Sequence, residues 1–119
     1  MKHVKLNLSG HRNPALEQAG FLWPGCLQVD LTDPELPQKV SGFLSQYIDS
    51  GDRVTVALPG LSALSALVIA SILGLSGQLP DIQTILRDEQ GEFGLGPVHD
   101  LNQLRTQVAR RHRSDIIHL

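Results

Sequence analysis

The sequence has little cysteine and little charge, and each shortage excludes a class of protein. Its single cysteine, Cys26, excludes a disulfide framework and a thiolate zinc cluster. Only 18% of the 119 residues are charged, and the formal net charge is −2. General binding of DNA or RNA requires many Lys and Arg contacts with phosphates, so this balance argues against it. A small anionic ligand that is held by a few local donors fits the same composition.

The sequence also lacks targeting and membrane signals. Its first residues, Met-Lys-His-Val-Lys, have no apolar core like that of a signal peptide. The most apolar segment, 58–75, carries Pro59 and three serines and is shorter than the roughly 20 residues of a membrane span. We therefore expect a cytoplasmic protein with no membrane span. Its length, without linker or repeat, predicts one domain over residues 1–119.

Metal ligands are not grouped in this sequence. The histidines have neither a pair at i,i+4 nor a carboxylate at ligand spacing; they are His3, His11, His99, His112 and His118. We expect no metal and no cofactor. Cys26 lies in an apolar segment, which favours a small core residue over a nucleophile.

What the sequence has is an alternation of strand-like and helix-like segments. Strands are predicted at 4–8, 26–31, 54–58 and 82–86. Helices are predicted at 14–19, from the Asp33-Pro34-Glu35 start to Gly51, at 62–73 and at 101–113, with Leu101, Leu104 and Val108 of the last facing inward. The segment 88–97 is rich in glycine and is either a hairpin or a loop. Strands spaced by helices predict an α/β fold with a mostly parallel sheet between helices.

The strongest local pattern is the segment 53–74. Val54, Val56 and Leu58 form a buried strand, Pro59-Gly60 turns the chain, and an apolar helix follows. Ser62 is the predicted N-cap of this helix and Gly74 its stop. A strand that enters a helix through a glycine turn directs backbone N–H groups at one spot, which suits a phosphate. The alternative is an ordinary turn without a ligand.

A second candidate segment, Ser9-Gly10-His11-Arg12-Asn13, follows the first strand. Gly10 allows a tight turn, and the next three residues bring hydrogen-bond donors beside a helix start. The alternative is a solvated polar loop. Ligands of open α/β sheets bind at the carboxyl ends of strands, which places Arg87, at the end of 82–86, on the same rim. The predicted ligand-binding residues are Ser9, Gly10, His11, Arg12, Asn13, Pro59, Gly60, Leu61, Ser62 and Arg87.

Two further features have simpler explanations. The segment Gly60-Leu61-Ser62 lacks the second small residue of a hydrolase nucleophile elbow, because Leu64 stands there. The last helix has a basic second half, with Arg105, Arg110, Arg111 and Arg113, and attraction to the helix dipole is sufficient to explain it.

Three segments together carry a family resemblance: 7–11 (NLSGH), 51–62 (GDRVTVALPGLS) and 100–105 (DLNQLR). In order and spacing they resemble the small CRISPR-associated proteins of type III antiviral systems that have a Rossmann-like, CARF-type domain and no effector domain. The resemblance covers nearly the whole chain. It implies a three-layer Rossmann-like sandwich and a homodimer or higher homo-oligomer.

The resemblance also implies a ligand, since such proteins bind cyclic oligoadenylate second messengers, typically cyclic tetra-adenylate, across their two-fold axis. Some cleave the ring as metal-independent nucleases, and others only sequester it. By position, the contacts are carried over to 9–13 and 59–62, with His11 as a candidate acid or base and Arg12 as a charge clamp. No second titratable group with an assigned role is evident, which favours binding without efficient turnover. The competing hypothesis is a small α/β structural or protein-interaction domain without a nucleotide ligand. Neither hypothesis assigns a role to the loop 21–25 or the tail 114–119.

Overall fold

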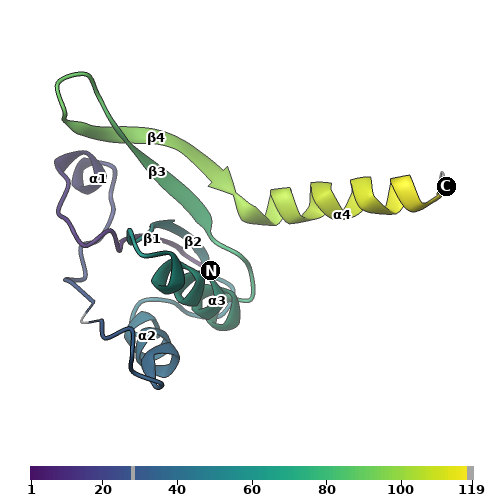
Figure 1. Ribbon diagram of the computed structural model, residues 1–119, viewed down its shortest axis with the longest axis horizontal. Helices are drawn as coiled ribbons and strands as arrows, with labels where there is room; N and C mark the ends of the chain where they lie inside the picture. The colour runs from purple at the N-terminus through teal and green to yellow at the C-terminus, as the bar shows by residue number, and fades with distance from the viewer. Residues whose placement is uncertain (28, 118–119) are drawn as a thin grey trace.

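The computed structural model describes residues 1–27 and 29–117 and arranges them as one sheet with four helices (Figure 1). In chain order the elements are β1 (His3–Asn7), α1 (Pro14–Gln18), α2 (Leu36–Leu44), β2 (Arg53–Ala57), α3 (Ser62–Ser76), β3 (Asp81–Arg87), β4 (Phe93–Asp100) and α4 (Leu101–Ile117). Among the described residues, none of the helices has the length and apolar character that a membrane crossing demands.

The sheet has the strand order β1-β2-β3-β4. β1 pairs with β2 and β2 with β3 in parallel, whereas β4 runs antiparallel to β3. The turn 88–92 explains this reversal, because so short a connection joins only antiparallel neighbours. The predicted α/β class is confirmed, but the sheet is only partly parallel, and the segment 88–97 forms part of a hairpin.

One face of the sheet packs on α2 and α3 and holds the main core. Leu6 of β1 and Val56 of β2 are fully buried there, together with Leu44 of α2 and Ile72 of α3. Burial of each such side chain contributes roughly 1.5–3 kcal/mol, so this layer is the main source of stability.

The opposite face is covered much less. Leu16 of α1 and Phe21 pack there over Ala57 and Ile85 of the sheet. α1 has only five residues, and Figure 1 shows it near the hairpin end of the sheet. A full three-layer Rossmann-like sandwich is therefore not formed by the described residues, since a single short helix lies on this side.

The predicted strand at 26–31 is wrong. Residues 26–27 and 29–31 are irregular, and Cys26 is exposed rather than in the core. The free edge of β1 is occupied instead by Leu22, whose backbone N–H and C=O pair with Lys5 and Asn7 at 2.9 Å each. The Asp30 carboxylate also accepts hydrogen bonds from Thr32, which turns the chain.

Predicted helix boundaries also differ. The helix predicted to run to Gly51 ends at Leu44, and turns follow it. α2 begins at Leu36, after a turn in which the Asp33 carboxylate accepts a hydrogen bond from the N–H of Glu35. Leu61, not Ser62, is the N-cap of α3. Gly74 does not end α3, because Gly77 three residues later adopts the left-handed conformation (φ 89°) that closes it.

The last helix projects from the body. Asp100 caps α4 by accepting a hydrogen bond from the N–H of Gln103 at 2.9 Å. The prediction that Leu104 and Val108 face inward is wrong, because each is 55% exposed. In Figure 1, α4 continues the direction of β4 away from the other helices. The Cα radius of gyration, 16.0 Å, accordingly exceeds the value of about 13.5 Å expected for a compact chain of this length.

Candidate functional site

The loop that follows β1 is held by one buried side chain, Asn7. Its Nδ2 donates to the backbone oxygen of His11 at 2.9 Å. Its Oδ1 accepts from the N–H and the hydroxyl of Ser9 at 3.1 and 2.6 Å. Gly10 lies between them with φ 86°, a conformation that side-chain-bearing residues rarely adopt. These bonds fix the loop as a closed turn without any ligand.

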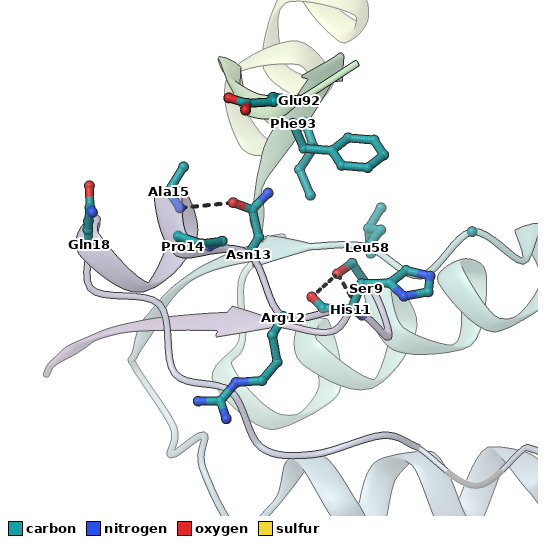
Figure 2. Close-up of a pocket in the computed structure, with 12 residues that line it drawn as sticks. Ser9, His11, Arg12, Asn13, Pro14, Ala15, Gln18, Leu58, Glu92 and Phe93 are labelled. Carbon is teal, nitrogen blue, oxygen red and sulfur yellow. Dashed lines mark hydrogen bonds between the residues drawn. The ribbon is translucent and has the colours of Figure 1, made fainter. Parts of the chain in front are cut away.

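Asn13 joins this loop to α1. Its side-chain oxygen accepts from the N–H of Ala15 at 2.9 Å, and Pro14 occupies the first helical position, so the predicted Asn-Pro helix start is confirmed. Figure 2 shows the amide nitrogen of Asn13 on the side opposite Ala15, toward the hairpin. The cap therefore leaves a donor directed at the space between loop and hairpin.

A cavity of about 670 Å³ lies at the carboxyl ends of β1 and β2, with the β3–β4 hairpin as its far wall (Figure 2). Its lining residues are Ser9, His11, Arg12, Asn13, Pro14, Ala15, Gln18, Leu58, Gly60, Ile85, Glu92 and Phe93. The volume falls within the range of about 300–1,000 Å³ that is usual for small-molecule sites. This is also the edge of a parallel sheet at which ligands ordinarily bind.

The structure brings together half of the predicted ligand-binding residues. Those that line the cavity are Ser9, His11, Arg12, Asn13 and Gly60; those outside its lining are Gly10, Pro59, Leu61, Ser62 and Arg87. Gly10 shapes the loop, and the backbone oxygen of Pro59 accepts from the Ser65 hydroxyl at 2.9 Å. Arg87 is not part of the lining but lies beside Phe93, with its guanidinium 4.7 Å from the centre of the Phe93 ring.

Sequence reasoning missed the far wall of the cavity. Glu92 is the last residue of the hairpin turn, Phe93 follows the turn, and Ile85 precedes it. The sequence signal for these residues was the glycine-rich segment 88–97 after a strand. Such a segment indicates that the chain turns back, but it does not say over which part of the sheet the returning chain lies. Only the antiparallel pairing of Arg87 with Phe93 folds this wall back toward the loop 9–13.

The lining carries charge of both signs. Arg12 forms an ion pair with Glu17 through Nε and Oε1 at 2.9 Å, and both side chains are largely exposed. Such an exposed pair contributes at most about 1 kcal/mol, so Arg12 can exchange Glu17 for a ligand phosphate at small cost. Glu92 and His11 both border this cavity, with their side chains directed away from each other (Figure 2). Among the described residues, no group of three or more His, Cys, Asp or Glu side chains is arranged to hold a metal ion.

A second polar cluster lies at the amino ends of the strands. It is on the thinly covered face of the sheet, the face on which Leu16 and Phe21 pack. His3 and Thr55 are joined through Nε2 and Oγ1 at 2.7 Å, and Arg53 donates from Nε to the buried carboxylate of Asp81 at 2.8 Å. Desolvation lowers the pKa of His3, and the positive charge of Arg53 lowers it further. Within the described part of the chain, every buried side-chain nitrogen and oxygen has a partner. We assign this cluster a structural role.

Known proteins provide no further identification of this site. The chain matches no protein-family model, no curated protein and no solved structure.

Proposed function

We propose that this protein binds a cyclic oligoadenylate, with cyclic tetra-adenylate as the first ligand to test, and lowers its level in type III CRISPR antiviral signalling. The observation that carries the proposal is the cavity between Ser9–Asn13 and Gly60. Ser9, His11 and Gly60 belong to two of the three segments on which the family resemblance rests. Sequestration is the proposed mode of action.

The cavity chemistry supports a nucleotide ligand. Arg12 borders the cavity with its guanidinium turned away from the hairpin (Figure 2), and it would supply a cation for a phosphate by a change of rotamer that releases Glu17. The amide of Asn13, which is directed toward the hairpin, can hydrogen-bond to the edge of a base. Phe93 supplies an aromatic surface, and stacking of a base on such a ring is worth about 1–3 kcal/mol. Groups that suit a base, and with a change of rotamer a phosphate, therefore border the same cavity.

The size of the cavity supports a homodimer. At about 670 Å³ it matches a drug-sized molecule, and a ring of four nucleotides is larger. One chain then encloses part of the ring, and a second copy covers the remainder. In this proposal the ligand lies across the interface between two identical chains.

The deciding experiment is incubation of the purified protein with labelled cyclic tetra-adenylate. Retention of the intact ring supports sequestration. Retention with linear products makes the protein a ring nuclease, with His11 and Glu92 as the first residues to replace. No retention of this ring, or of rings of other sizes, overturns the proposal and leaves the alternative, a protein-interaction domain.

Arg12→Ala tests the site itself. Loss of a charge-assisted hydrogen bond is expected to weaken ring binding by about 1–3 kcal/mol, measured by calorimetric titration. The matched control is Lys39→Ala, which also removes an exposed, ion-paired cation but lies on α2, outside the cavity lining. Equal affinities for the two variants would remove Arg12 from the site.

A further inference from the structure

α4 is held to the body at its base. Asn102 clamps the backbone of Leu79 by accepting from its N–H at 3.0 Å and donating to its oxygen at 2.7 Å. Beyond this clamp the helix extends away from the other elements (Figure 1). It has 17 residues with a single alanine, and isolated helices of about this length are only marginally stable in water. A helix of this composition is stabilised when it packs on another surface.

One side of α4 carries an apolar stripe. Leu101, Leu104 and Val108 follow the i, i+3, i+7 spacing of one helix face, and Arg111 continues that face. Leu104 and Val108 remain 55% exposed. Arg110 lies on nearly the opposite side, since adjacent helical residues are about 100° apart.

β4 carries a second apolar stripe. Phe93, Leu95 and Val98 oppose Arg87, Ile85 and Gln83 of β3, which alternate along that strand and so share one face. This is the thinly covered face of the sheet, and the three side chains of the stripe are 55%, 42% and 51% exposed. Phe93 also lines the cavity and contacts Arg87, so Leu95 and Val98 are the part of this stripe that lies free of the cavity. Two exposed apolar stripes thus lie on consecutive elements of the same chain.

The two elements match in length. At about 3.3 Å per residue, β4 spans roughly 26 Å, and at about 1.5 Å per residue, α4 also spans roughly 26 Å. They meet without a linker, since β4 ends at Asp100 and α4 begins at Leu101. A two-fold axis about 7 Å inside β4 from this junction lays α4 of one copy antiparallel along β4 of the other, with Leu101, Leu104 and Val108 opposite Val98, Leu95 and Phe93 in that order.

The charges match in this arrangement. Residues 101–113 include four arginines and no acidic residue, whereas the hairpin turn carries Asp88, Glu89 and Glu92. Within one chain the turn and the outer end of α4 lie at opposite ends of the longest axis (Figure 1), which measures 49 Å. With the two-fold axis placed about 7 Å inside β4, Arg111, roughly 15 Å along α4 from Leu101, lies beside Glu92 of the second copy.

From these observations we infer that α4 is a dimerisation arm, which packs its Leu101–Leu104–Val108 face on Leu95 and Val98 of a second copy of this chain and reaches the edge of the cavity at Phe93. The arms are exchanged symmetrically, and each is held by apolar contact along its length and by arginine–carboxylate attraction at the turn. This interface belongs to the second copy that the proposed function requires. It rests on separate observations, and its oligomeric state is measured without nucleotide.

The test compares charge reversals by sedimentation. The wild-type protein is expected to be a dimer, and Arg111→Glu to raise the dimer dissociation constant about tenfold. Arg110→Glu makes the same change of charge at the adjacent residue, on the opposite helix face, and is expected to have little effect. Glu92→Lys is expected to weaken self-association like Arg111→Glu, and an equimolar mixture of Arg111→Glu and Glu92→Lys chains to restore dimers.

Leu104→Gln tests the apolar contact, with Gln103→Ala, on the opposite side of α4, as its control. It is expected to shift the protein toward monomer while melting temperature reports an intact body. Three results would each overturn the inference: a monomeric wild type, equal effects of Arg110→Glu and Arg111→Glu, or a mixture that stays monomeric. Because no nucleotide is present, these results are independent of whether the cavity binds cyclic tetra-adenylate.

Discussion

Asn7 is the residue that shapes the mouth of the cavity. Both polar atoms of its amide are used within the loop 9–11, so the backbone there is set before a ligand arrives. A binding loop that is already ordered loses little conformational entropy on binding. The hydrogen bonds of this one side chain therefore order the part of the cavity lining formed by the loop 9–11.

Gly60 gives the most direct residue-scale prediction. A Cβ built at Gly60 meets nothing within 4 Å, and its φ is not in the left-handed range. Gly60→Val should therefore leave the free energy of unfolding within about 0.5 kcal/mol of the wild type, as is usual for surface changes. The added side chain enters the lining of the cavity, so affinity for cyclic tetra-adenylate should fall at least about tenfold, a loss of about 1.4 kcal/mol.

The matched control is Gly42→Val, which also adds a side chain in open space but lies on α2. Affinity is measured by calorimetric titration and stability by thermal melting of the same samples. A Gly60→Val protein that melts normally and binds normally would show that no ligand approaches this turn.

Asp52 gives a pH-dependent prediction. Its carboxylate is buried and accepts hydrogen bonds from the N–H of Asp49 at 2.8 Å and that of Lys2 at 3.1 Å. The bond from Asp49 is the main cause that holds the pKa of Asp52 below its usual value of 3.8, and the bond from Lys2 adds to it. A lowered pKa in the folded state contributes stability above pH 3.8, and this contribution is lost as the pH falls below that value.

Asp52→Asn should therefore lower stability at pH 7 and flatten the loss of stability between pH 4 and pH 2, because a group that titrates in the wild type is gone. Urea unfolding at a series of pH values measures both effects. Parallel stability curves for variant and wild type in acid would show that Asp52 is not linked to folding.

At the scale of elements, sequence patterns predicted correctly those helices and strands whose formation depends on neighbouring residues in the chain. The Asn13-Pro14 helix start and the strand over Val54 and Val56 depend on nearby residues, and both are present. The segment 26–31 has similarly apolar residues, but a strand also needs a free partner edge. Leu22 occupies the edge of β1, and no local pattern reports that competition.

The same distinction between local and long-range interactions explains which cavity residues could be predicted from the sequence. The loop 9–13 and Gly60 could be placed on one rim because the carboxyl ends of parallel strands meet there. Glu92 and Phe93 could not, since their position depends on a hairpin that crosses back over the sheet edge. For α4, the spacing of Leu104 and Val108 predicted a face correctly, but periodicity does not say whether that face is covered by its own chain.

The hairpin gives an element-scale prediction. A Cβ at Gly96 would lie 2.8 Å from Cγ of Leu86 and closer still to the Thr84 hydroxyl, which donates to the backbone oxygen of Pro97 at 2.6 Å. Gly96→Ala should therefore destabilise the protein by about 1–3 kcal/mol through overpacking. Gly94, on the same strand, has open space where its Cβ would stand, which makes Gly94→Ala the control. Equal melting temperatures for the two variants would contradict close packing at Gly96.

At the scale of the whole molecule, charge is separated more than the net value of −2 suggests. Basic residues dominate 101–113, and acidic ones gather at the hairpin turn, on opposite ends of the longest axis. If the exchanged arms bring these ends together, the dimer dissociation constant should rise several-fold between low salt and about 0.5 M salt, because exposed charges are screened. Sedimentation at several salt concentrations measures this. Association that strengthens steadily with salt would indicate apolar contact alone.

β4 and α4 also form a lever. The cavity wall at Phe93 begins one end of this unit, the outer turn of α4 ends the other, and the Asn102 clamp on Leu79 lies between them as a fulcrum. With an arm of roughly 26 Å, a tilt of about 10° at the clamp moves the outer end by roughly 4–5 Å. Because the two arms of this lever are about equal in length, a displacement of the wall at Phe93 reappears at the far end with about the same size, where it changes which surfaces the arm can reach.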